Sequence, residues 1–185
     1  MLEKNYEKIM AFVEPIMKEA EKRAEEEKNN SFKFQWENHN NCKLSNNNKI
    51  LRKINNNGWN TNVKGNKILK KNSVNIFKIR VNENNNNDTS GLAFGISRAS
   101  SSFSQKDNWN MNCNGIDYTG NFKSFKNTKI NKGDIITFIV NLKDGTLEVK
   151  KNDEVLGKLN NIPKNEDLVP TVCIYFVNNE IEIID

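Results

Sequence analysis

From residue 31 onward, apolar and polar residues alternate in short runs, the pattern of β-strands that bury one face. Gly, Asn, Ser and Asp, which tolerate turn geometry, separate these runs. The predicted strands are residues 32–36, 49–54, 73–81, 91–97, 134–142, 146–151, 170–177 and 180–184. No helical stretch of ten residues lies between them, so we expect antiparallel pairing in a two-layer β-sandwich rather than parallel crossover units.

Turn residues refine this picture. Asp144-Gly145 lies between two alternating runs and predicts a tight hairpin. Asn152-Asp153 and Asn178-Asn179 predict further turns. Residues 172–177 are apolar on both faces, which predicts a central strand. Residues 98–128 form one long loop rich in aromatic residues, in which we expect one or two short irregular strands.

The first 30 residues follow a helical period instead. Pro15 removes a backbone donor there, which predicts a kink or two short helices. The chain therefore divides into an amphipathic helical segment, 1–30, and a β domain, 31–185. The helical period places the apolar residues of this segment on one stripe, which must pack against another surface. Three partners stay open for it: the chain's own sandwich, a second copy bound through residues 1–28, or a segment upstream. The stripe consists of Leu2, Tyr6, Ile9, Met10, Val13, Ile16, Met17, Ala20 and Ala24.

Composition narrows the class of protein. Asparagine accounts for 36 of the 185 residues, a bias that AAT-rich coding would produce. Residues 1–28 carry six basic and eight acidic side chains, net −2, so the rest of the chain, with 22 basic and 15 acidic, is net +7. No apolar run approaches the roughly 18 residues of a membrane helix, and the first residues do not resemble a signal peptide. We therefore expect a cytoplasmic protein with no membrane partner.

The residues that usually carry catalysis or bind metals are sparse. The only histidine, His39, and Cys42 make at most half of a metal site. Cys113 has no second histidine to pair with, and Cys173 alternates within a predicted buried strand. Gly133-Asp134 precedes a predicted strand. Such a pair could include a ligand-binding acid, but it more often forms the turn that begins the strand. Because phosphate-binding and nucleophile motifs are absent too, we predict no enzyme activity, no cofactor and no metal.

Nucleic-acid binding is a disfavoured alternative. The β domain is basic, and Lys64, Lys67, Lys70 and Lys71 cluster in sequence. A groove that follows a phosphate backbone also needs aromatic side chains between the cations. Residues 32–36 supply three aromatic residues, but a buried strand face explains them equally well.

Seven segments between about Phe32 and Asp185 resemble the SPRY domain family and follow the family's order. Two departures are Lys78, where an acidic residue is usual, and Asn110, where glycine is usual. The segments are Gly58-Trp59 with Val63-Lys64-Gly65, Asn75–Val81, Gly91–Ser97, Asn108-Trp109-Asn110, Gly133–Ile136, Asp144–Leu147 and Leu168–Val172.

The resemblance implies a bent antiparallel two-sheet sandwich of the concanavalin-like jelly-roll type. It also implies a non-enzymatic adaptor or scaffold that binds a protein or a short peptide through loops at one rim. Domains of this family often select substrates in ubiquitin-ligase assemblies, although this sequence contains no RING, B-box or SOCS-box element. Trp109 matches a family position that borders the binding pocket.

Long loops on a rigid β scaffold are a common way to build a recognition surface. We expect residues 53–59 and 101–110 to meet at one rim, where aromatic side chains offer apolar area and polar ones offer hydrogen bonds. For each aromatic residue, a structural role at the end of the sandwich stays open. The candidate residues are Lys53, Asn55, Trp59, Phe103, Asn108, Trp109 and Asn110.

Carbohydrate binding is a second alternative, because lectin-like sandwiches share this strand pattern. A sugar site would need a carboxylate and an amide beside an exposed aromatic residue. Asp107, Asn108 and Trp109 are a minimal version of such a site.

Overall fold

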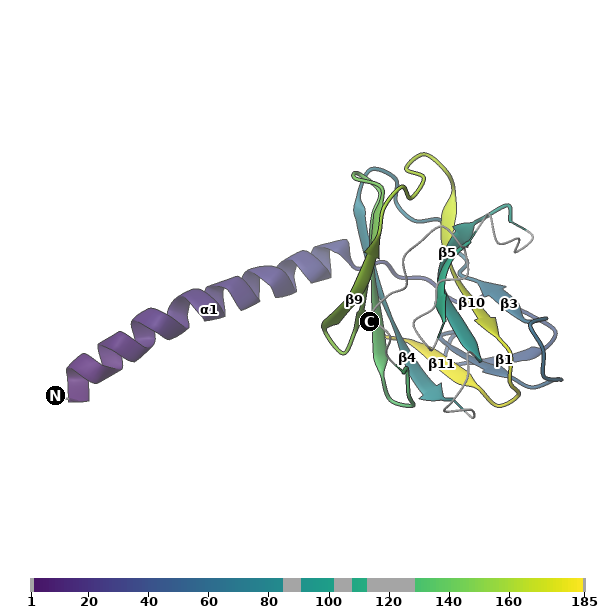
Figure 1. Cartoon of the computed structure of the whole chain (residues 1–185), viewed down its shortest axis with the longest axis horizontal. Helices are drawn as coiled ribbons and strands as arrows, with labels where there is room; N and C mark the ends of the chain where they lie inside the picture. Colours follow the sequence, from purple (N-terminus) through teal and green to yellow (C-terminus); the bar gives the residue numbers. More distant parts are fainter. Residues whose placement is uncertain (1, 85–90, 102–107, 113–128, 185) are drawn as a thin grey trace. The chain divides into compact units, whose positions relative to one another are not determined.

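The computed structural model describes residues 2–84, 91–101, 108–112 and 129–184. The chain divides into two compact units, residues 1–31 and residues 32–185 (Figure 1).

The first unit is a single helix, α1 (Leu2–Asn30). Glu, Lys and Ala dominate it, and all three are good helix formers. The helix continues through Pro15, so the expectation of two short helices is wrong, while a kink at Pro15 stays a prediction. The Asn30 side-chain amide donates to the Glu26 carbonyl oxygen at 2.8 Å at the end of the helix. No helix in the described part of the chain is both long and apolar enough to span a bilayer.

The second unit contains two antiparallel sheets, which confirms the predicted fold class. The larger sheet has seven strands in the order β1-β2-β11-β4-β7-β8-β9. Their bounds are β1 Cys42–Ser45, β2 Ile50–Lys53, β11 Glu180–Ile184, β4 Val74–Glu83, β7 Ile135–Asn141, β8 Thr146–Lys151 and β9 Glu154–Leu159.

The smaller sheet has four strands in the order β3-β10-β5-β6. β10 lies between two neighbours, as the run of apolar residues on both of its faces predicted. β6 confirms the short strand expected within residues 98–128. The bounds are β3 Asn62–Lys64, β10 Leu168–Ile174, β5 Leu92–Arg98 and β6 Asn108–Asn112.

Seven of the eight predicted strands are present, and β1, β3 and β9 were not foreseen. The exception is residues 32–36, which form only an isolated bridge between Trp36 and Gly65. Phe32, Phe34 and Trp36 are nevertheless buried. The alternation therefore identified the buried face correctly, but a ladder also needs a neighbouring strand, which the pattern cannot specify.

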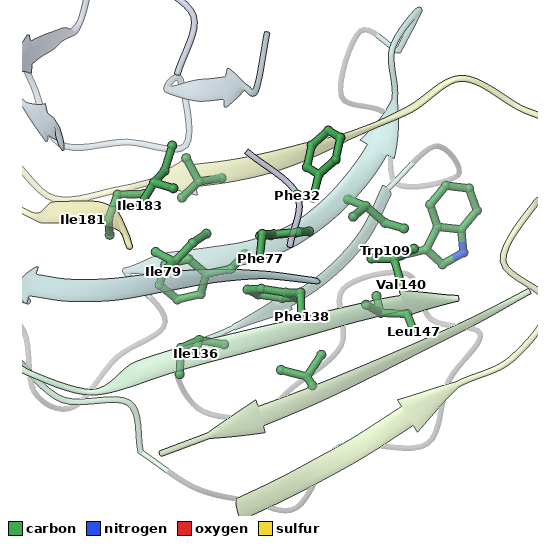
Figure 2. Packing of buried hydrophobic residues seen from close by; sticks show 14 of the residues in the cluster. Phe32, Phe77, Ile79, Trp109, Ile136, Phe138, Val140, Leu147, Ile181 and Ile183 are labelled. Carbon is green, nitrogen blue, oxygen red and sulfur yellow. The ribbon is translucent and has the colours of Figure 1, made fainter. Parts of the chain in front are cut away.

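The core lies between the inward faces of the two sheets (Figure 2). Phe77 of β4 stacks on Phe138 of β7 with 4.9 Å between ring centroids. Phe34 packs edge-to-face on Phe77, so the extended segment before β1 contributes to the same core. Inward residues alternate with outward ones along β7, where Ile136 and Val140 are fully buried on either side of Phe138.

The predicted turns are confirmed at two hairpins and at the connection from β10 to β11. Gly145 has φ +72° in the β7–β8 turn, a conformation that glycine adopts without strain. Asn152 and Asp153 have φ +46° and +71° between β8 and β9, and Asn178 has φ +70° before β11. Asparagine and aspartate tolerate this left-handed region better than other residues with a side chain.

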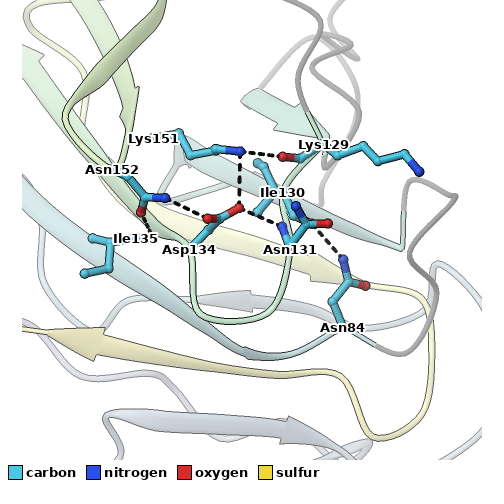
Figure 3. Close-up of polar contacts among 8 residues, drawn as sticks. All are labelled: Asn84, Lys129, Ile130, Asn131, Asp134, Ile135, Lys151 and Asn152. Atoms are coloured by element: carbon cyan, nitrogen blue, oxygen red, sulfur yellow. Dashed lines mark hydrogen bonds and ion pairs between the residues drawn. The ribbon is translucent and has the colours of Figure 1, made fainter.

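Asp134 closes the turn that leads into β7, as predicted (Figure 3). Its Oδ2 accepts a hydrogen bond from the Asn131 backbone N–H at 2.8 Å, and its Oδ1 accepts one from the Asn152 side chain at 2.7 Å. The Lys151 ammonium lies 3.4 Å from Oδ2. Both carboxylate oxygens therefore hold neighbouring turns together.

Candidate partner-binding surface

Lys53, the last residue of β2, is fully buried. Its ammonium group donates to the carbonyl oxygens of Gly58 at 2.7 Å and Ile174 at 2.9 Å, and to Oδ1 of Asn60 at 3.0 Å. These acceptors match the three N–H donors of an ammonium group, which lets a buried charge persist without an acidic partner. Burial lowers the pKa of Lys53 below its usual value. Lys53 thus ties β2, the following loop and the end of β10 together instead of reaching solvent.

Trp59 lies on the loop that Lys53 holds, and its side chain is 39% exposed. The centroids of the Trp59 and Tyr175 rings lie 5.4 Å apart, with an angle of 67° between the ring planes. The centroids of the Tyr175 and Phe176 rings lie 4.6 Å apart, and the angle between these ring planes is also 67°. These edge-to-face contacts join three aromatic rings from two loops into one half-exposed cluster.

Backbone contacts fix these two loops to each other. The Gly58 N–H donates to the Tyr175 carbonyl oxygen at 2.9 Å, and the Val177 N–H donates to Oδ1 of Asn57 at 3.0 Å. Lys53 and Asn178 are joined through the Asn178 N–H and the Lys53 carbonyl oxygen, also at 2.9 Å. We name the two loops, residues 54–61 and 175–179, the Trp59 rim.

The Trp59 rim contains no charged side chain in its two loops of eight and five residues, although 28% of the chain is charged. Its exposed apolar side chains are Ile54, at 46%, and Trp59. Asn55, a predicted site residue, is also exposed here, and its side-chain amide lies 3.4 Å from the Asn40 carbonyl oxygen. The remaining exposed amides of the rim belong to Asn56, Asn57, Asn60 and Asn178.

Trp109 occupies a different place, in the core. It lies on β6 opposite Ile96 of β5 and is only 8% exposed (Figure 2). The Arg98 guanidinium lies 5.4 Å from the centroid of its ring, a cation–π contact. Arg98 also forms a two-point ion pair with Glu166, in which Nη2 lies 3.0 Å from Oε1 and Nε contacts Oε2. Trp109 therefore closes one edge of the sandwich beneath a surface ion pair.

Asn110 is also buried, at 5% exposure. Its side chain lies over Gly95 of β5, where a β-carbon would come within 2.7 Å of Oδ1, and its Nδ2 is 3.9 Å from Sγ of Cys173. Asn108 is the first residue of β6, and Phe103 lies outside the described residues. A partner-contact role for these two residues stays a prediction.

The structure separates the two groups that the sequence placed at one rim. Trp109 faces Ile96, which is opposite Pro170 near the start of β10, whereas Trp59 contacts Tyr175, just past the end of β10. Pro170 and Tyr175 are five residues apart along the chain. At about 3.3 Å per residue in a strand, the two tryptophan positions are therefore separated by about 17 Å along β10. Lys53, Asn55 and Trp59 come together, and Trp109 and Asn110 lie apart from them.

Tyr175 and Phe176 are the rim residues that the sequence did not indicate. They fell within the predicted strand 170–177, but β10 ends at Ile174. An apolar run gives no sign of where its last backbone hydrogen bond lies, so these two rings were assigned to a strand rather than to an exposed loop.

Two pockets lie near these groups. One, of about 340 Å³, touches the rim at Asn178 and is also lined by Arg52, Glu83 and Glu180. The other, of about 400 Å³, adjoins Trp109 through Arg98. Its acidic residues are already paired, Glu166 with Arg98 and Asp167 with Lys71 at 2.7 Å. The further lining residues of the second pocket are Ala99 and Ser100.

No group of three His, Cys, Asp or Glu side chains that could hold a metal occurs within the described ranges. Burial raises the pKa of the Cys42 thiol to about 11 and that of Cys173 to about 12, so both stay protonated at neutral pH. Burial, and secondarily the charge of Lys53, lowers the pKa of His39, whose Nδ1 accepts the Asn41 N–H at 3.2 Å.

The fold is similar to those of several solved structures. The SPRY domain of human HERC1 is 21% identical, with a TM-score of 0.62 over 78% of this chain and 92% of that one. The TRIM65 PSpry domain is 9% identical, with a TM-score of 0.65 over 85% and 92%. The NHR1 domain of Drosophila melanogaster Neuralized is 19% identical, with a TM-score of 0.56 over 82% and 98%.

Comparisons of sequence are negative: no protein-family profile and no curated protein matches the chain. The likeness to solved structures lies below 25% identity, and it establishes the fold alone. Two antiparallel sheets with the strand order described above, aligned over most of each SPRY domain, identify residues 32–185 as a SPRY-like β-sandwich.

Proposed function

We propose that this chain is a non-enzymatic recognition module that binds a protein or a short peptide through the Trp59 rim, as an adaptor or scaffold. The observation that carries the proposal is an uncharged, half-exposed aromatic cluster held on two fixed loops. The SPRY-like fold supports it, because the family resemblance implies recognition through loops at one rim.

The chemistry of the rim suits a partner segment with an apolar side chain. Tryptophan and tyrosine are the residues that most often dominate binding energy at protein interfaces. The amides of Asn55 and Asn57 can donate and accept hydrogen bonds along a peptide backbone. Because backbone contacts already fix both loops, little conformational entropy is lost when a partner binds.

Capture from native lysate tests this proposal. We expect intact protein to retain a specific partner that the Trp59→Ala and Ile54→Ala variants lose, with thermal midpoints close to that of the parent. Ile68→Ala is the matched control, because Ile68 is 47% exposed and Ile54 is 46% exposed. Retention of the partner by Trp59→Ala would contradict the proposal.

Carbohydrate binding is the second candidate, and one observation favours it. Trp59 presents an aromatic surface beside several amides, a combination that also suits a neutral sugar. Binding on a glycan array that Trp59→Ala abolishes would replace the protein partner with a glycan. Loss of that binding on chelation would add a metal requirement.

We also propose that α1 mediates self-association. Five of the nine exposed large apolar side chains among the described residues lie on this helix, with 53–73% exposure. Water contact on that scale is unfavourable, and isolated helices are marginally stable without packing. Sedimentation velocity should show a concentration-dependent oligomer that Ile9→Glu combined with Ile16→Glu converts to a monomer. The exposed residues are Tyr6, Ile9, Phe12, Ile16 and Met17.

A further inference from the structure

We propose that α1 pairs with α1 of a second copy in an antiparallel arrangement over residues 2–20. This inference rests on the self-association proposed above and specifies its geometry. The observations are the spacing of apolar residues along α1, the gradient in their size and the position of its charged residues.

The spacing supplies a seam for helix pairing. Residues 2, 6, 9, 13, 16 and 20 alternate in steps of four and three, the pattern of the a and d positions of a coiled coil. Tyr6, Ile9 and Ile16 on this seam are 65%, 60% and 56% exposed. Pro15 falls at a c position, off the seam, so its missing hydrogen bond leaves the contact surface intact.

The first three seam residues, Leu2, Tyr6 and Ile9, are together larger than the last three, Val13, Ile16 and Ala20, and this difference sets the direction. An antiparallel pair places Tyr6 opposite Ile16 of the second copy, Ile9 opposite Val13, and Leu2 opposite Ala20. Every layer then combines a larger with a smaller side chain. A parallel pair would face Tyr6 with Tyr6 and Ala20 with Ala20, which crowds one layer and leaves a void in another.

The charged residues favour the same direction. Beyond Ala20 the seam continues into Arg23 and then Glu27. Arg23 is already paired within the helix, with Nε 3.0 Å from Oε1 of Glu19. A parallel pair would bring each of these residues against its own copy, whereas an antiparallel pair over residues 2–20 leaves both beyond the contact. Antiparallel helix dipoles also attract each other.

Disulfide trapping in the full chain tests the geometry. Tyr6→Cys and Ile16→Cys variants are mixed, reduced and then oxidised with oxidised glutathione. We expect a cross-linked dimer only in the mixture, because two Tyr6 positions in an antiparallel pair are ten residues apart along the axis, about 15 Å. A disulfide needs α-carbons within about 7 Å.

Lys18→Cys is the matched control, because position 18 lies on the opposite face of the helix from the seam. A mixture of Tyr6→Cys and Lys18→Cys should cross-link no more than the parent chain, which retains its own cysteines. Cross-linking of each single variant by itself would show a parallel pair and overturn this inference, while self-association would stand. Parent protein that sediments as a monomer at every concentration would overturn both.

Discussion

A buried ammonium group at Lys53 determines the shape of the candidate site. We expect Lys53→Met, which keeps the side-chain length, to lower the free energy of unfolding by about 2–4 kcal/mol. The buried carbonyl oxygen of Ile174 and the half-buried one of Gly58 would lose their donor, and an unsatisfied buried acceptor costs about 1–3 kcal/mol. Urea denaturation measures the change.

Lys43→Met is the control for Lys53, since Lys43 is exposed on β1. Its effect should stay within about 0.5 kcal/mol, as for most surface substitutions. Equal stability of both variants would mean that the Lys53 hydrogen bonds contribute nothing to the fold.

Trp109 provides a prediction about the core rather than about binding. Because its ring packs among buried residues beneath Arg98, Trp109→Ala should cost about 3–5 kcal/mol of folding stability. Trp59→Ala, on the exposed rim, should cost far less. Thermal denaturation compares the two variants. A nearly unchanged midpoint for Trp109→Ala would show that Trp109 does not contribute to the core.

These residues show why the candidate site was only partly predictable. Trp59 and Asn55 were identified because loop aromatic and amide residues are common at binding surfaces. Lys53 was assigned to the surface because lysine is rarely buried, and only the three-dimensional arrangement reveals the three oxygens around its ammonium group. Trp109 lies in a short strand within a long loop, and only the pairing of that strand with β5 places the ring in the core.

At the scale of elements, the β5–β6 pair depends on the absence of a side chain at Gly95. A β-carbon there would overlap the Trp109 carbonyl oxygen and crowd the Asn110 side chain. We therefore expect Gly95→Ala to displace β6 and to cost roughly 3 kcal/mol, as overpacking of a tight core does. Loss of amide protection in β6, measured by hydrogen exchange, would report the displacement.

Gly133→Ala separates steric overlap from backbone strain. Gly133 has φ +89°, but no described atom lies within 4 Å of the point that a β-carbon would occupy there. Its substitution should cost about 1 kcal/mol from strain alone. If Gly95→Ala costs no more than Gly133→Ala, close packing between β5 and β6 is not what holds that edge.

Elements with strong alternation were the predictable part of the fold. Ile136, Phe138 and Val140 repeat at every second position, and the turn at Asp144-Gly145 is equally local, so this hairpin follows from neighbouring residues alone. β1 and β3, which are four and three residues long, were not predicted. β3 depends on a partner distant in sequence, β10, whereas β1 pairs with the neighbouring β2 across a turn of residues 46–49.

For the whole molecule, the distribution of charge predicts how binding responds to salt. Residues 29–185 carry net +7, yet the two loops of the Trp59 rim carry none. Partner capture that depends on Trp59 should therefore change little between about 0.05 and about 0.5 M salt, because screening acts only on charges. Capture at both concentrations, with Trp59→Ala as background, measures this. A steep loss of capture would indicate a polyanionic partner instead.

The left-handed turns have a consequence for how this chain accommodates its high content of asparagine. Of the nine non-glycine residues with positive φ among those described, eight are asparagine, and the ninth is Asp153. A mutational drift toward asparagine would disrupt strand interiors, but at these bends it supplies a residue suited to the required handedness. Bends between strands can thus accommodate part of the asparagine excess, while most of the packed interior stays apolar. The asparagines concerned are Asn46, Asn47, Asn48, Asn56, Asn72, Asn152, Asn161 and Asn178.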